Sequence, residues 1–179
     1  ILSIYQENAH EFNDVNLATS INKLGKFRGG ISPFITEDPR LKKLVDHATS
    51  SIKLNDPQWE SRHLANICGG VAKLRIKAPA LFEAIAAEAQ AQIRMFNPQG
   101  LANTSWAFAT AGVSSTRLFE AIAAEVQVKI QKFKAQELSN TSWAFATAGI
   151  SSTRLFEAIA AEAQTQIRNF NAQALANTS

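Results

Sequence analysis

The octapeptide LFEAIAAE begins at residues 81, 118 and 155, with a constant step of 37 residues. Segments 81–117 and 118–154 are identical at 27 of 37 positions, so they are tandem copies of one repeat. A period of this length is typical of proteins in which each repeat is one supersecondary element that stacks on its neighbours. The repeat therefore constrains the fold more strongly than any other feature of the chain.

The regularity of the repeat changes along the chain. We expect a degenerate helical repeat with a longer connection over residues 1–56 and a degenerate half-repeat over 57–80. Regular repeats follow over 81–117 and 118–154, and a truncated one over 155–179. Because the chain opens on isoleucine rather than methionine and its last copy is incomplete, we expect it to be an excerpt of a longer protein.

Each repeat is predicted to contain two helices. The first, over 116–133, carries apolar residues four positions apart on an alanine-rich body, and Ser115 is its expected N-cap. The second begins at Asn97, a capping residue followed by proline, and ends at Gly112, a residue that commonly ends helices. The same signals predict a further helix over 41–54 in the N-terminal part.

Two helices of this length cannot bury their apolar faces alone, so neighbouring repeats must stack. No segment shows the two-residue period of a strand. We therefore predict an all-α fold, an α-solenoid of stacked helix-turn-helix repeats of 37 residues.

The composition excludes several classes of protein. A single cysteine, Cys68, rules out an internal disulfide framework, and three scattered histidines do not supply the ligands of a structural zinc site. No apolar stretch reaches the roughly 20 residues that cross a bilayer. Carboxylates such as Glu83 and Glu120 recur in every repeat, whereas a catalytic site is singular. We expect no metal, no cofactor, no membrane association and no enzymatic activity.

Polar residues recur on one face of the second helix. Asn103 and Asn140 are each followed seven residues later by a threonine, Thr110 or Thr147. An amide carries both a donor and an acceptor, so a row of such residues can read the edges of successive bases. The alternative is a structural asparagine ladder that bonds to the backbone of the neighbouring repeat.

Trp106 and Trp143 occupy equivalent positions on the same helices. A surface tryptophan can stack on a base. An aromatic residue that recurs in a repeat array usually packs between repeats, so we expect these two side chains in the core.

The differences between the two regular copies concentrate at the end of the first helix and in the turn that follows. Cations there complement the helix dipole without any ligand. They can also form a strip along the phosphates of a nucleic acid. Both interpretations stay open for the residues of this edge, namely Arg94, Lys129, Gln131, Lys132, Lys134 and Arg168.

The phrase NPQGLANTSWAFATAG, followed by a helix that opens with LFEAIAAEA, resembles the octotricopeptide repeat family and the related repeats near FAST kinase-like and RAP domains. The likeness covers residues 57–179 well and 12–56 loosely. Gly69 stands where the family motif has tryptophan, and the chain contains no RAP domain. The resemblance implies a mitochondrial or chloroplast protein that binds single-stranded organellar RNA and acts in RNA stability, processing, editing or translation.

The residues also allow a protein–protein scaffold of the armadillo, HEAT or tetratricopeptide type, which uses the same architecture. Seven basic and seven acidic side chains over residues 81–179 favour that alternative. The motif and the variable basic edge favour RNA. We therefore predict single-stranded RNA as the partner, with other proteins as further partners along the solenoid.

Overall fold

The computed structural model describes residues 1–27, 33–54 and 59–167, and over these ranges the chain is all-α, without a strand. The predicted fold class is confirmed. The chain forms two compact units, an N-terminal unit of residues 1–89 and a C-terminal unit of residues 90–179. None of the helices described is both long enough and apolar enough to span a membrane.

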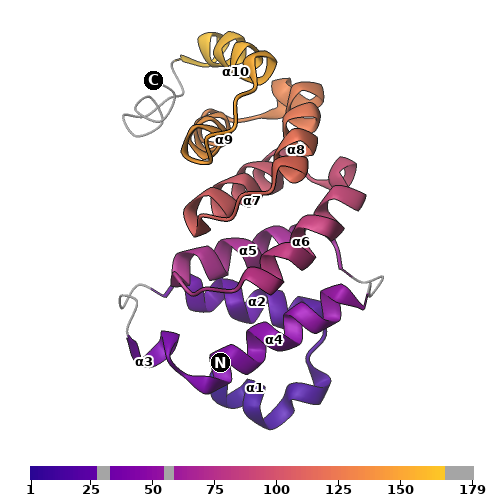
Figure 1. The fold of residues 1–179 in the computed structure, drawn as a ribbon, viewed down its shortest axis with the longest axis vertical. Helices are drawn as coiled ribbons and strands as arrows, with labels where there is room; N and C mark the ends of the chain where they lie inside the picture. The colour runs from indigo at the N-terminus through magenta and orange to yellow at the C-terminus, as the bar shows by residue number, and fades with distance from the viewer. Residues whose placement is uncertain (28–32, 55–58, 168–179) are drawn as a thin grey trace. The chain divides into compact units, whose positions relative to one another are not determined.

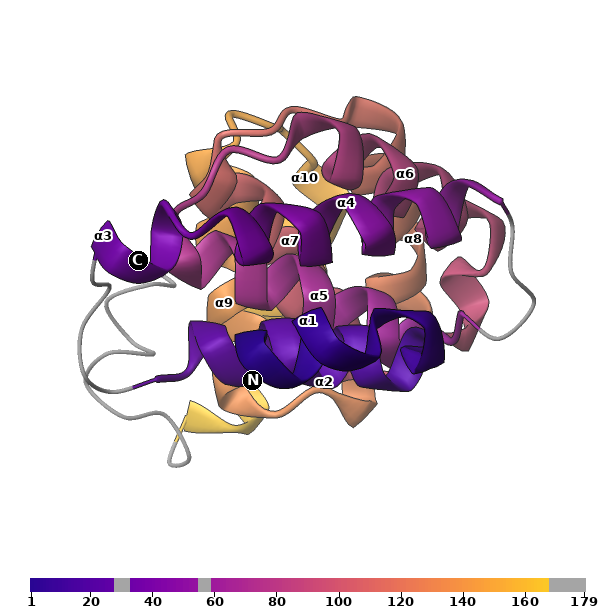
Figure 2. The same ribbon diagram turned by 90° about the horizontal axis from the view of Figure 1, so that it is seen from below.

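The N-terminal unit is built mainly on the packing of α2 against α5 and of α4 against α1 and α2 (Figure 1). Figure 2 shows α4 along one side of this unit and α2 along the other. The elements are α1 Leu2–Asn8, the 3-10 turn Ala9–Glu11, α2 Asp14–Gly25, α3 Pro33–Thr36, α4 Pro39–Lys53, α5 Ser61–Leu74 and α6 Pro79–Ala91, within which the unit ends.

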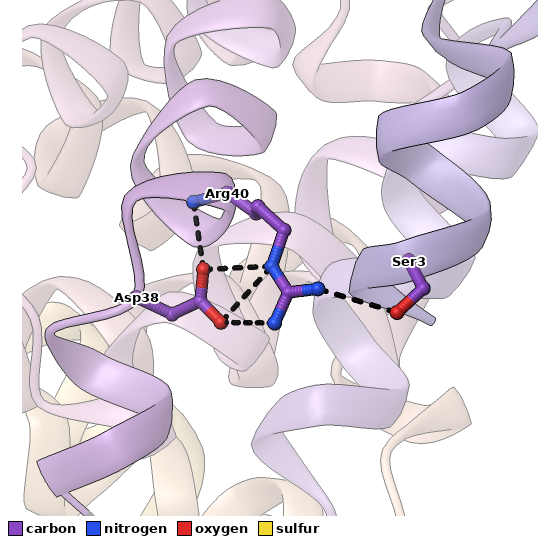
Figure 3. Close-up of polar contacts among 3 residues, drawn as sticks. All are labelled: Ser3, Asp38 and Arg40. Carbon is purple, nitrogen blue, oxygen red and sulfur yellow. Dashed lines mark hydrogen bonds and ion pairs between the residues drawn. The ribbon is translucent and has the colours of Figure 1, made fainter.

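The start of α4 shows how a local capping signal fixes a helix end. The carboxylate of Asp38 accepts the backbone N–H of Arg40 at 2.8 Å, so the helix begins at Pro39, two residues before the predicted start. The Arg40 guanidinium also bonds to this carboxylate and holds the pKa of Asp38 below its ordinary value. Its Nη1 donates to Ser3 Oγ at 3.2 Å and so links α4 to α1 (Figure 3).

The C-terminal unit begins with the 3-10 turn and the second helix of one regular repeat. The next repeat follows complete, with a first helix, a short 3-10 turn and a second helix. The predicted ends of α7 are confirmed, because the Asn97 side chain accepts the Gly100 N–H at 2.7 Å and Gly112 adopts the left-handed conformation. Ser115 is the N-cap of α8 but forms no side-chain capping bond. The elements are the 3-10 turn Ile93–Met95, α7 Pro98–Ala111, α8 Thr116–Lys129, the 3-10 turn Ile130–Lys132, α9 Ala135–Thr147 and α10 Thr153–Thr165.

Phenylalanines at the same three places in each regular repeat fill the core. One lies on the first helix, one ends the turn and one lies on the second helix. The rings of Phe119 and Phe145 meet edge to face with centroids 5.0 Å apart, a favoured aromatic geometry. Each such buried ring stabilises the fold by about 1.5–3 kcal/mol. All six phenylalanines are buried, namely Phe82, Phe96, Phe108, Phe119, Phe133 and Phe145.

Helices α2 and α5 run parallel and in close backbone contact. Near their N-termini, His63 Nδ1 lies 2.6 Å from Asp14 Oδ2, and both side chains are buried. Towards their C-termini, Gly25 faces Gly70. A Cβ atom on Gly70 would lie 2.7 Å from the carbonyl oxygen of Ile21, so only hydrogen fits between the two backbones.

The neighbouring glycines of α5 are expected to respond in opposite directions to the same substitution. Gly70→Ala places a methyl group against backbone and should destabilise the protein by about 1–3 kcal/mol. Gly69→Ala is the control, because its Cβ meets no atom within 4 Å; alanine should stabilise the helix by about 0.5–1 kcal/mol. Urea unfolding measures both, and shifts of the same sign would contradict the close helix contact.

Candidate nucleic-acid interface

A polar and aromatic stripe runs along the second helix of each regular repeat. On α7, Asn103 and Trp106 are half-buried and Thr110 is exposed. Residues at i, i+3 and i+7 share one helix face, so these three side chains lie in a row. The same three positions on α9 have the same exposures. We call the six residues the Asn-Trp-Thr stripe: Asn103, Trp106, Thr110, Asn140, Trp143 and Thr147.

The rest of each second helix explains why this stripe faces outwards. Leu101 and Phe108 of α7 are fully buried, as are their counterparts Leu138 and Phe145 of α9. Helices α7 and α9 pack against each other, so the two halves of the stripe lie on neighbouring helices of one unit (Figure 1).

The expected burial of the two tryptophans in the core is wrong. Trp106 and Trp143 are only half-buried, because Phe108 and Phe145 fill the interior two positions further along each helix. The predicted site residues do not include these tryptophans. Their spacing of three residues from Asn103 and Asn140 is the signal that finds them, since it puts them on the polar face.

The asparagines lie on this face without bonding to a neighbouring repeat. Asn140 Oδ1 accepts a hydrogen bond from Gln136 Nε2 of its own helix at 2.9 Å. Within the described ranges, neither Asn103 nor Asn140 forms a hydrogen bond to the backbone of another repeat. The described residues thus form no asparagine ladder, and the amide groups remain on the exposed side of the helices.

The predicted basic edge lies at the turns that lead into α7 and α9. Arg94 belongs to the turn before α7, and Lys132 to the turn before α9, next to Gln131; all three side chains are exposed. Lys134 is the exposed N-cap residue of α9, and its backbone N–H donates to Glu137 Oε2 at 2.9 Å. Arg168 lies outside the described residues.

Lys129 differs from the other residues of the edge, because its ammonium group joins two repeats. Its Nζ donates to the carbonyl oxygens of Arg94 at 2.7 Å and Phe96 at 2.8 Å. It also forms an ion pair with Glu125 at 2.8 Å, which leaves the side chain 19% exposed. The ammonium group is thus already engaged in the turn of the preceding repeat.

One repeat later, Gln166 makes the corresponding contact. Its Nε2 donates to the carbonyl oxygen of Phe133 at 2.8 Å and to Glu162 Oε1 at 2.6 Å. Phe133 and Glu162 are the equivalents of Phe96 and Glu125. We call this interaction, formed by Lys129 or Gln166, the turn clamp. It ties the turn of one repeat to the first helix of the next.

The edge and the stripe together offer two kinds of contact. Arg94, Lys132 and Lys134 supply cations where α7 and α9 begin, and the stripe continues from there along the two helices. Cations and partly accessible aromatic rings on one protein are the combination by which proteins bind single-stranded nucleic acids, with phosphates on the cations and bases on the rings.

Comparison with known protein families finds a match over most of this chain. The family model of RESC6, the RNA-editing substrate-binding complex 6 protein, matches residues 31–179. The matched range includes both regular repeats, the whole stripe and the whole basic edge. Among curated proteins, no match to this chain is found.

The turn clamp should tolerate an amide but not an apolar side chain. Lys129→Met removes the donor to two carbonyl oxygens and leaves Glu125 without its cation, so we expect a decrease of about 1–3 kcal/mol in the free energy of unfolding. Lys129→Gln reproduces the residue of the next repeat and should cost less than half as much. Denaturant unfolding of the two variants compares them, and equal decreases would show that the clamp does not hold the turn.

Proposed function

The chain belongs to the RNA-editing substrate-binding complex 6 protein family, and we propose that its C-terminal unit binds single-stranded RNA through the Asn-Trp-Thr stripe and the basic edge. The observation that carries this proposal is the pair of half-buried tryptophans, Trp106 and Trp143, at equivalent positions of two neighbouring helices. The role is one of binding, without a catalytic step.

Stacking on the tryptophans is the first contribution to affinity. Every base has an apolar face, so an exposed indole ring accepts any of the four bases and contributes about 1–3 kcal/mol. One ring per repeat matches a strand that advances along the array, as in other helical repeats that take one base each. Half-burial of Trp106 and Trp143 fixes the rings while leaving part of each accessible.

The polar members of the stripe supply the second contribution. Asn103 and Asn140 carry donor and acceptor groups beside the rings, within the same helix face. A stacked base presents its edge to its surroundings, so these amides, together with Thr110 and Thr147, are placed to distinguish one base from another. In this proposal the asparagines and threonines determine which RNA sequence is preferred, and the tryptophans contribute affinity for any sequence.

The basic edge supplies the third contribution. Arg94, Lys132 and Lys134 are exposed cations that can neutralise phosphates without regard to sequence. Their number is modest, which fits a strand held partly by stacking. A protein partner on the same stripe remains the rival hypothesis, and the absence of RNA binding at low salt would favour it.

Two further parts of the proposal concern the protein partners of the chain and its cellular compartment. The family name refers to a complex, so proteins of an RNA-editing complex are the second class of partner that we propose. The sequence resemblance implies a mitochondrion or a chloroplast. We propose the mitochondrion, because the family match gives no support for a chloroplast.

Removal of the two indole rings tests the stacking role. We expect Trp106→Ala with Trp143→Ala to lower the affinity for a degenerate single-stranded RNA pool by about 1–3 kcal/mol for each ring. Fluorescence anisotropy on single-stranded and duplex RNA measures this decrease. Met95→Ala with Val128→Ala, two exposed apolar residues of the same unit, is the matched control and should leave affinity unchanged. Equal decreases for the two double variants would contradict specific stacking.

The salt dependence of binding tests the basic edge separately. Lys132→Gln with Lys134→Gln should weaken binding to all sequences alike and lower the slope of log K against log salt by about 0.7 for each phosphate that is no longer neutralised. Lys129→Gln serves as the comparison, because Lys129 is engaged in the turn clamp and should change the slope less. An unchanged slope in the double variant would remove the edge from the interface.

A further inference from the structure

The second helices of the N-terminal unit carry different chemistry at the register positions of the stripe. The thirteenth residue after the N-cap residue is a threonine of the stripe in both helices of the C-terminal unit, Thr110 in α7 and Thr147 in α9. The same position is a lysine in the N-terminal unit, Lys73 on α5 and Lys26 directly after α2. Both lysines are exposed. Two ammonium groups thus replace two hydroxyl groups.

These two lysines lie close together. The parallel contact of α2 and α5, with Gly25 against Gly70, brings the C-terminal ends of both helices to one place. The pKa of Lys73 lies below its ordinary value, first because partial burial desolvates its ammonium group and second because the charge of Lys26 repels it. The charge of Lys26 thus acts on the ammonium group of Lys73, which places the two cations in one region of the surface.

Arg75 adds a third cation in a strained conformation. It follows α5 at φ 54°, in the left-handed region, which a side chain disfavours. The equivalent residues of the next two repeats are Gly112 and Gly149, which adopt the same conformation without strain. Backbone strain that a glycine would remove is a recognised mark of a functional position. Arginine at this position supplies an exposed guanidinium group, which glycine would not.

Stabilisation of the helix dipole does not account for this cluster. The last turns of α7 and α9 contain no basic residue, so these two helices end without one. A cation in the last turn, such as Lys73, also serves the dipole without any need for Arg75 in the left-handed region. Within the described ranges, neither Lys26 nor Arg75 forms an ion pair with a carboxylate.

We propose that Lys26, Lys73 and Arg75 bind phosphate groups of a single-stranded RNA backbone, as a second RNA contact located in the N-terminal unit. This inference rests on the proposed function and extends it to residues 1–89. Gly69 takes the place of the tryptophan here, and a Cβ atom on it would meet no other atom within 4 Å. This unit therefore holds the backbone of the strand without stacking its bases, so its contribution does not depend on sequence.

Arg75→Gly gives the sharpest test in the full chain, because its two effects have opposite signs. Glycine relieves the strained backbone, so the melting temperature should rise. Removal of the guanidinium should lower RNA affinity several-fold and reduce the slope of log K against log salt by about 0.7. Lys26→Gln with Lys73→Gln should reduce the slope further. Lys43→Gln with Lys53→Gln, two exposed lysines of α4, is the control with the same change of charge.

An RNA oligomer with abasic residues separates this contact from the stripe. It retains phosphates and lacks bases, so its binding should depend on Lys26, Lys73 and Arg75 and be unaffected by Trp106→Ala with Trp143→Ala. Unchanged affinity and slope in the Arg75 and lysine variants, while the tryptophan variant no longer binds RNA, would overturn this inference and leave the proposed function intact. No binding of single-stranded RNA by the unaltered chain at low salt would overturn both.

Discussion

A donor from the following repeat holds the turn between the two helices of each regular repeat, and the register of the C-terminal unit depends on this contact. Lys129 and Gln166 differ in charge and length, yet both reach the carbonyl oxygen of the phenylalanine that ends the turn. The phenylalanine is thereby fixed in the core, and the second helix starts at a defined place. The side chains of that helix then face inwards or outwards in the same order in successive repeats.

The helix ends show how much of the fold the sequence determines locally. Asn97 and Gly112 bound α7 as predicted, because capping depends on a few neighbouring residues. Capping signals do not show which face of the helix the tryptophans occupy, and only their spacing from Asn103 and Asn140 points to the polar face. Phe108 and Trp106 are both aromatic and two positions apart, and which of them is buried depends on the neighbouring helix.

The role of Lys129 was hidden from the sequence for a different reason. Its partners are carbonyl oxygens 33 and 35 residues away, and backbone groups leave no residue-type signal. The basic edge could be recognised as a variable, cationic segment from two aligned copies. Whether a given lysine on it is exposed or engaged requires the turn geometry. The same holds for Lys26 and Lys73, which only the parallel contact of α2 and α5 brings together.

The turn clamp gives the array a direction. Each of the two regular repeats is completed by a group from its C-terminal neighbour, Lys129 for the first and Gln166 for the second. A deletion that removes one repeat from the C-terminal side therefore also removes the donor from the turn before it. Fraying should thus begin at the C-terminal boundary of a shortened array and proceed towards the N-terminus, one turn at a time.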